Sequence, residues 1–272
     1  MNRKKIAILG CGNIGSAIAK GLVNSKLYKS SQIFVTRKSE ELLEKFSKEG
    51  FQTSTNNLEA VKNSEIIIIA VTPQQLDDLL KEIDSELKEN KHIILSIVTG
   101  ATINQIKKQI TKKIPVIRVM PNTAIAIQES MTCIASLEED KDSLDIAKYI
   151  FNQLGKTIII HEELMVPATA LCASGIAFFL RAIRAASQGG IEIGFHAEDA
   201  LFMASQTAKG AASLLLKTEN HPEGEVDKVT TPMGITISGL NQMEHAGFSS
   251  SLIKGIVTSA EKAKTLYAKK DS

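Results

Sequence analysis

The chain has 272 residues, of which 43% are hydrophobic and 23% are charged, and this is enough for a nucleotide-binding domain plus a smaller partner domain, each with its own core. The 32 basic and 30 acidic residues leave a formal charge of +2, without the basic excess that is typical of nucleic-acid binding. We therefore expect two domains and a small-molecule partner rather than a nucleic acid.

The first part of the chain, up to about residue 161, alternates short β-branched runs with amphipathic stretches, which is typical of a doubly wound, mostly parallel sheet of the Rossmann type. The expected strands are 6–9, 33–36, 66–71, 93–97, 116–119, 132–135 and 157–160. The expected helices are 14–23, 40–48, 76–87, 103–109 and 144–154. Residues 1–161 are therefore predicted to form an α/β nucleotide-binding domain.

The motif GCGNIG at residues 10–15 lies where the first strand passes into the first helix. In dinucleotide-binding folds the first glycine permits a tight turn, the second lets the backbone approach a pyrophosphate, and the third allows close packing of helix and strand. A purely structural glycine-rich turn is the alternative. The motif predicts that phosphate is held at the start of this helix, by Gly10, Gly12, Asn13, Ile14 and Gly15.

The second strand ends at Thr36 and is followed by Arg37 and Lys38, where an NAD enzyme would carry a carboxylate for the ribose hydroxyls. A carboxylate would repel a 2′-phosphate, whereas these cations and the hydroxyl would attract it. NADP is therefore favoured as cofactor, with NAD as a second one, unless the two cations are ordinary solvated charges.

After residue 161 no strand-like alternation remains, and alanine-rich helical stretches are expected at 164–188, 197–216, 234–246 and 250–268. Small residues line the first of these stretches, which favours close helix packing either at a subunit interface or inside a tight bundle. Residues 162–272 are therefore predicted to form an all-helical second domain.

Several motifs resemble those of the pyrroline-5-carboxylate reductase family in the expected order over nearly the whole chain. They are AVTPQ at 70–74, RVMPNT at 118–123, TALCASGIAF at 169–178 and TPMGITISGL at 231–240. The sequence departs from the family pattern at several places: Thr72 stands for lysine, Cys172 for serine, Ala173 and Met233 for glycine, and Ile176 for proline.

The resemblance implies NADPH-dependent reduction of 1-pyrroline-5-carboxylate to proline, the last step of proline biosynthesis, with no metal ion. It implies that Thr236 donates a hydrogen bond to the imine nitrogen, although this threonine could instead only cap a helix. The substrate carboxylate would be held by Thr231 and by backbone groups of Met233, Gly234 and Ile235. Glu219 matches a glutamate near the substrate, or is a solvated loop acid.

Further residues are assigned to the cofactor by the same resemblance, at the ends of strands where open α/β sheets bind ligands. They are Asn57, Ala70, Val71, Thr72, Pro73, Val98, Met120, Pro121 and Asn122. For Asn57, a role as a helix cap is the alternative. The resemblance also implies a homodimer formed through the helical domain, or a larger ring-like oligomer of dimers.

Two other functions remain open. The departures at Thr72 and Met233 permit an NAD(P)-dependent reductase of another imine, a keto acid or a deazaflavin, and a non-catalytic NADP-binding protein is the third possibility. The three cysteines, Cys11, Cys133 and Cys172, show no CxxC spacing, which favours a reducing compartment and hence the cytoplasm. The longest apolar run, residues 66–71, is far shorter than the roughly 18 residues that cross a bilayer, so no membrane segment is expected.

Overall fold

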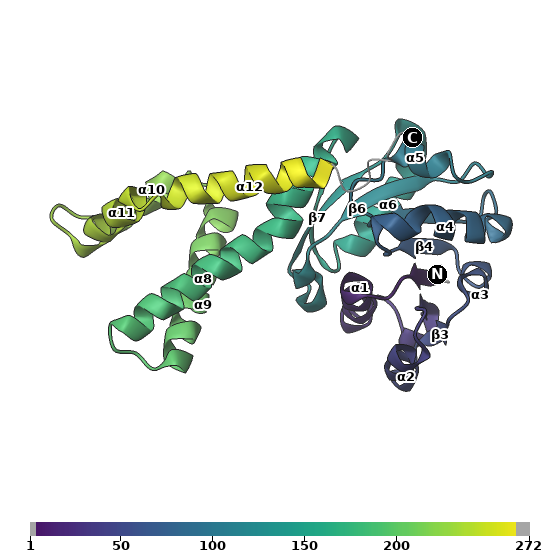
Figure 1. The fold of residues 1–272 in the computed structure, drawn as a ribbon, viewed down its shortest axis with the longest axis horizontal. Coiled ribbons are helices and arrows are strands. Elements are labelled where there is room, and N and C mark those ends of the chain that lie inside the picture. Colours follow the sequence, from purple (N-terminus) through teal and green to yellow (C-terminus); the bar gives the residue numbers. More distant parts are fainter. Residues whose placement is uncertain (1–3, 265–272) are drawn as a thin grey trace. The chain divides into compact units, whose positions relative to one another are not determined.

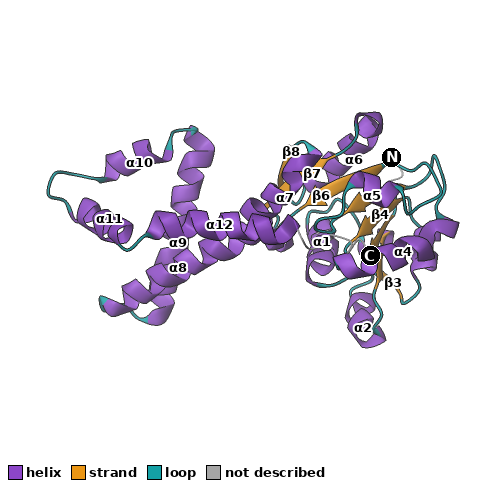
Figure 2. Ribbon diagram, turned by 45° about the horizontal axis from the view of Figure 1, so that its top comes forward, coloured by secondary structure: helices purple, strands orange, loops and turns teal. Residues whose placement is uncertain are grey.

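The computed structural model describes residues 4–264, which divide into two compact units. The first unit ends at Ser174 and also takes in the chain from Ser259 onward, and the second unit is Gly175–Thr258. Every strand drawn in Figure 2 belongs to the first unit, and the second unit is drawn only as helices and loops. The expected α/β fold followed by an all-helical part is therefore confirmed.

The first unit is built on one eight-stranded sheet with the order β3-β2-β1-β4-β5-β6-β7-β8. All neighbouring strands are parallel except β6 and β7. The chain order reverses between β1 and β4, which is where doubly wound sheets bind their ligands. The strands are β1 (Ile6–Leu9), β2 (Ile33–Thr36), β3 (Gln52–Ser54), β4 (Ile66–Ile69), β5 (Ile93–Ser96), β6 (Val116–Met120), β7 (Ser130–Ala135) and β8 (Gly155–Ile159).

Helices cover both faces of this sheet, because alternate residues of each buried strand point to opposite sides. Ile6 and Ile8 of β1 pack into one core with α1 (Asn13–Asn24), α2 (Glu40–Lys48) and α6 (Lys141–Phe151). Ala7 and Leu9 pack into the other core. That second core includes side chains of α3 (Asn57–Lys62), α4 (Pro73–Ile83) and α5 (Ile103–Lys107). Figure 1 shows how these helices flank the strands.

Two short elements of this unit, β3 and α3, were not predicted. β3 has three residues at an edge of the sheet and carries no run of buried apolar side chains, and α3 has only six residues. Elements this short contain too few residues to show the alternation of a strand or the 3.6-residue period of a helix. Two predicted ends were also wrong: β4 stops at Ile69, and the chain leaves α4 after Ile83 for a 3₁₀ turn.

Five helices follow the sheet: α8 (Gly175–Glu192), α9 (Ala197–Thr218), α10 (Pro222–Val229), α11 (Ile235–His245) and α12 (Phe248–Lys264). The expected helix 164–188 is interrupted, because α7 (Met165–Ala168) is followed by a π-helical turn, Thr169–Ser174, before α8 begins. The unpredicted α10 is short and rich in acidic residues, so it lacks a clear apolar face. Of the helix expected over 250–268, residues 265–268 lie outside the described residues.

One stretch, Glu162–Glu192, has the length and composition of a membrane-crossing helix, with a mean hydropathy of 1.7 over its most apolar 18-residue window. The expectation of no membrane segment counted only unbroken apolar runs, and it therefore overlooked this stretch, in which alanines are mixed with small polar residues. A single helix of this kind is weak evidence for a membrane, since helices of soluble proteins pass the same test.

Candidate functional site

The glycine motif forms the turn between β1 and α1, and two of its glycines are required by close packing. Gly10 has a φ of +86°, and a Cβ there would lie 2.5 Å from Cγ1 of Val71. A Cβ on Gly15 would lie 3.0 Å from the carbonyl oxygen of Gly10. Gly12 is different, because a Cβ there would meet nothing within 4 Å. The space beside Gly12 is therefore open to a ligand that approaches the backbone closely.

Helix α1 begins next to this open space, and no side chain caps its start. Asn13, Ile14 and Gly15 form its first turn, where backbone N–H groups have no partner inside the helix. The turn is tied to β2, because the N–H of Cys11 donates to the carbonyl of Thr36 over 2.8 Å. This arrangement offers N–H donors and a favourable helix dipole to a phosphate.

A cavity of about 390 Å³ extends from the glycine turn along the ends of β2 and β4 to one face of α4. It brings together nine of the residues predicted for the cofactor, namely Gly10, Gly12, Thr36, Arg37, Lys38, Asn57, Ala70, Val71 and Thr72. Six lining residues were not predicted: Thr55, Gln74, Gln75, Asp78, Leu79 and Glu82. Polar residues at 74, 78 and 82 are four apart and so share one helix face, which is the signal that could have identified them.

The wall of this cavity at the end of β2 is held by side-chain hydrogen bonds. Arg37 donates through Nη1 to the carbonyl of Cys11 over 2.9 Å, which places its guanidinium beside the glycine turn. The hydroxyl of Thr36 donates to Oδ1 of Asn57 over 2.6 Å. Asn57 Nδ2 in turn donates to both carboxylate oxygens of Glu82, each at 3.1 Å.

These bonds bear on the alternative role of Asn57 as a helix cap. The cap of α3 is Asn56, whose side chain accepts from the N–H of Leu58. Asn57 is the first residue of the helix, and its amide points to Thr36 and Glu82 instead. The alternative that Asn57 is a cap was therefore wrong.

The other predicted cofactor residues lie outside this cavity. Pro73 starts α4, and Val98 follows β5, the strand next to β4. Met120 ends β6 and is buried. Pro121 follows it, and Asn122 caps a 3₁₀ turn by accepting from the N–H of Ala124. Because β1, β4, β5 and β6 are parallel, all these residues lie at the same edge of the sheet as the glycine turn.

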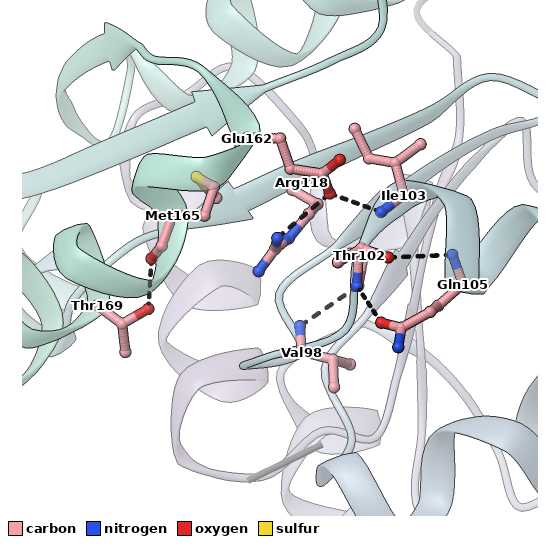
Figure 3. A network of polar contacts seen from close by, with 9 residues as sticks. Val98, Thr102, Ile103, Gln105, Arg118, Glu162, Met165 and Thr169 are labelled. Carbon is pink, nitrogen blue, oxygen red and sulfur yellow. Dashed lines mark hydrogen bonds and ion pairs between the residues drawn. The ribbon is translucent and has the colours of Figure 1, made fainter. Parts of the chain in front are cut away.

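Arg118, within the RVMPNT motif, is buried and forms an ion pair with Glu162 (Figure 3). Its Nη1 lies 3.2 Å from Oε1 of Glu162, and the same oxygen accepts from the backbone N–H of Ile103 over 2.6 Å. Burial lowers the pKa of Arg118, and the charge of Glu162 opposes this effect. The pair ties β6 and the start of α5 to the residues just before α7.

Except for Glu219, the residues predicted for the substrate lie at the start of α11, in the second unit. The N–H of Gly234 donates to the carbonyl of Thr231 over 2.9 Å, and a Cβ on Gly234 would lie 2.4 Å from the Thr231 hydroxyl oxygen. Met233 is fully exposed with a φ of +57°, a conformation that favours glycine. The turn therefore needs its glycine at 234 and carries a strained methionine at 233.

The cap of α11 is Gly234, followed by Ile235 and then by Thr236 as the second residue of the helix. The alternative reading of Thr236 as a cap was therefore wrong, and its half-buried side chain is left for another partner. Glu219 lies elsewhere, at the end of α9, with a left-handed φ of +56° and an exposed side chain.

Comparison with known proteins places these features in a family. The model for pyrroline-5-carboxylate reductase dimerisation matches residues 162–266, and the model for NADP oxidoreductase, coenzyme F420-dependent, matches residues 5–100. Pyrroline-5-carboxylate reductase 1 of Dictyostelium discoideum is 56% identical over 97% of this chain, which spans 50% of that protein's length. The pyrroline-5-carboxylate reductase of Methanosarcina acetivorans is 32% identical, covering 99% of this chain and 100% of that protein.

Solved structures of pyrroline-5-carboxylate reductases are also similar to this chain. The crystal structure of Plasmodium falciparum pyrroline carboxylate reductase with NADP bound has a TM-score of 0.88 and 25% sequence identity, covering 98% of this chain and 100% of that one. The enzyme from Coxiella burnetii has a TM-score of 0.87 at 28% identity, with coverages of 98% and 100%. The chain belongs to the pyrroline-5-carboxylate reductase family.

Proposed function

We propose that this protein reduces 1-pyrroline-5-carboxylate to proline with NADPH, as the last step of proline biosynthesis. The observation that carries the proposal is the cavity at the glycine turn, which Arg37 and Lys38 line at the end of β2. The match over the whole length of a pyrroline-5-carboxylate reductase supports it.

The residues of the cavity fit NADP. The open space at Gly12 and the uncapped start of α1 suit a pyrophosphate. Arg37 and Lys38 suit the 2′-phosphate, and Thr36 ends β2 with a hydroxyl rather than a carboxylate. NADPH, when bound, supplies the hydride. The residues from Met120 to Asn122, at the same edge of the sheet, would lie beside the nicotinamide.

The substrate would be handled at the start of α11. A protonated cyclic imine is already electrophilic, so a hydrogen bond to its nitrogen and an anchor for its carboxylate are sufficient. Thr236 supplies the hydroxyl for the nitrogen, directly or through water. Thr231 and backbone groups of Met233, Gly234 and Ile235 hold the carboxylate, with support from the helix dipole. Glu219 is assigned to the substrate on the family match alone.

The protein is proposed to act as a homodimer through its helical domain, residues 162–272, with residues 1–161 as the cofactor domain. The family match over 162–266 is described as a dimerisation region, and the helices expose many large apolar side chains that a partner subunit would cover. They include Phe179, Leu180, Ile193, Leu201, Phe202, Leu216 and Ile253. A ring-like oligomer of dimers is the alternative assembly, and the mass measured by light scattering would distinguish it from a dimer. The three free cysteines are compatible with a cytoplasmic location.

Steady-state kinetics test the proposal. Purified protein should consume NADPH when 1-pyrroline-5-carboxylate is added, and NADPH should give a higher kcat/KM than NADH. The same assay with another cyclic imine, a keto acid and a deazaflavin tests the alternative acceptors. Tight NADPH binding with no turnover of 1-pyrroline-5-carboxylate would refute the proposed reaction.

A further inference from the structure

Two cysteine thiols from different elements of the first unit face each other. Cys133 belongs to β7, and Cys172 belongs to the π-helical turn between α7 and α8. Their sulfur atoms lie 3.8 Å apart, with Cys133 as the hydrogen-bond donor. Cys133 is buried, whereas Cys172 is only partly buried. The pair therefore joins a buried cysteine to a more exposed one.

The two thiols also differ in acidity. The hydrogen bond from Cys133 lowers the pKa of Cys172 to about 7, and the same hydrogen bond, with burial, raises the pKa of Cys133. The third cysteine, Cys11, is buried, and burial raises its pKa. Because the thiolate is the reactive form, Cys172 is the cysteine expected to react first with an oxidant.

We propose that Cys133 and Cys172 form a redox-sensitive pair that closes to a reversible disulfide when a hydroperoxide oxidises the protein, and that the closed pair weakens cofactor binding. The sulfur of Cys172 attacks the peroxide, takes one oxygen to become a sulfenic acid and releases water or an alcohol. The thiol of Cys133 then attacks that sulfur, the S–S bond forms, and the hydroxyl leaves with the thiol proton as water. The peroxide is reduced by two electrons, and the two thiols are oxidised by the same number.

The geometry favours closure from the side of Cys172. A disulfide needs the sulfurs about 2.05 Å apart, so they must approach from the present 3.8 Å. Cys133 lies within β7, which is paired with β6 on one side and β8 on the other. Cys172 lies in the π-helical turn between α7 and α8, where no strand pairing holds the backbone. Closure is therefore expected to move the π turn rather than the sheet.

Movement of the π turn would displace the residues proposed to lie beside the nicotinamide. This second part of the inference rests on the proposed function. Nδ2 of Asn122 donates to the backbone carbonyl of Cys172 over 3.2 Å. Met120 is paired across the sheet with Cys133 itself. Movement of Cys172 therefore pulls on Asn122 at the end of this segment, while Met120 stays paired with Cys133, and this is expected to raise the dissociation constant for NADPH several-fold.

Peptide mapping tests the disulfide. Purified full-length protein is treated with hydrogen peroxide, blocked with an alkylating reagent and digested without reduction. The expected product is a cross-linked peptide pair containing Cys133 and Cys172, which dithiothreitol separates, while Cys11 stays a free thiol and serves as the internal control. In Cys133→Ala, Cys172 should stop at a sulfenic acid that dimedone traps. Free Cys133 together with Cys172 sulfinate in the wild-type protein, or no oxidation of either residue, overturns the proposal.

NADPH titration of the reduced and oxidised protein tests the effect on binding. The oxidised wild type should bind NADPH several-fold more weakly, and reduction should restore binding. Cys172→Ser, which introduces the residue typical of the family, should bind NADPH equally before and after peroxide. Equal affinity of the oxidised and reduced wild type overturns the proposed effect. Reduced protein that binds no NADPH would refute the proposed function, while the peptide map still decides whether the disulfide forms.

Discussion

Arg118 and Glu162 form an ion pair, 3.2 Å between Nη1 and Oε1, that joins a buried strand to the segment where the helical part begins. Arg118 is only 2% exposed, so its charge depends on this partner. Glu162→Ala should lower the free energy of unfolding by about 3 kcal/mol, because it leaves a buried cation unpaired. Urea denaturation measures the change.

The adjacent acid provides the matched control. Glu163 is exposed, and Glu163→Ala should change the free energy of unfolding by less than about 0.5 kcal/mol. Equal effects of the two substitutions would mean that the ion pair does not stabilise the fold.

Arg37 should set the preference for NADPH over NADH. Arg37→Ala removes a charge-assisted contact to the 2′-phosphate, worth about 1.5–3 kcal/mol, and so should weaken NADPH binding roughly tenfold to a hundredfold. NADH binding should change little. Fluorescence titration with both cofactors measures this, with Lys45→Ala as a control that removes an exposed cation outside the cavity. Equal losses of affinity for the two cofactors would show that Arg37 does not recognise the 2′-phosphate.

Thr236 should affect turnover rather than cofactor binding. Thr236→Ala should lower kcat roughly tenfold to a hundredfold through loss of one hydrogen bond to a charged group. Thr236→Ser keeps the hydroxyl and should recover most of the activity. Gln242→Ala, at an exposed position further along α11, is the control. An unchanged kcat in Thr236→Ala, with the fold intact by circular dichroism, would remove this residue from the mechanism.

Met233 should be replaceable by glycine without loss of stability. Its left-handed φ of +57° costs a non-glycine residue about 1–2 kcal/mol. Glycine avoids this cost, and the gain roughly offsets the extra backbone entropy that glycine loses on folding. Met233→Gly should therefore match or exceed the wild type in thermal unfolding, whereas the β-branched Met233→Val should be destabilised by more than about 1 kcal/mol. A valine variant as stable as the wild type would show that the turn adopts another conformation.

The sequence predicted the sheet and the glycine turn well, because both depend on local patterns. The unbroken apolar runs of β1 and β4 reflect burial between two helical layers, and the glycine motif occupies one turn. Edge strand β3 escaped prediction because three half-exposed residues carry no period.

The site was predicted less completely, because its remaining contacts are tertiary. Glu82 reaches Asn57 from another helix, and Cys133 meets Cys172 across 39 residues of chain. No local sequence pattern indicates contacts between residues so far apart in the chain. The alternative that Thr236 caps α11 was wrong for a related reason, since Gly234 approaches Thr231 closely and no side chain caps the helix.

Isotope transfer tests the central claim most directly. The protein is supplied with 1-pyrroline-5-carboxylate and NADPH deuterated at the nicotinamide C4 position, and the proline formed is analysed by mass spectrometry. If this chain brings the reduced nicotinamide to the cyclic imine, proline should carry one deuterium, transferred when NADPH is labelled on one face of the ring and not on the other. Formation of no proline, or of proline without deuterium from either label, would contradict the account.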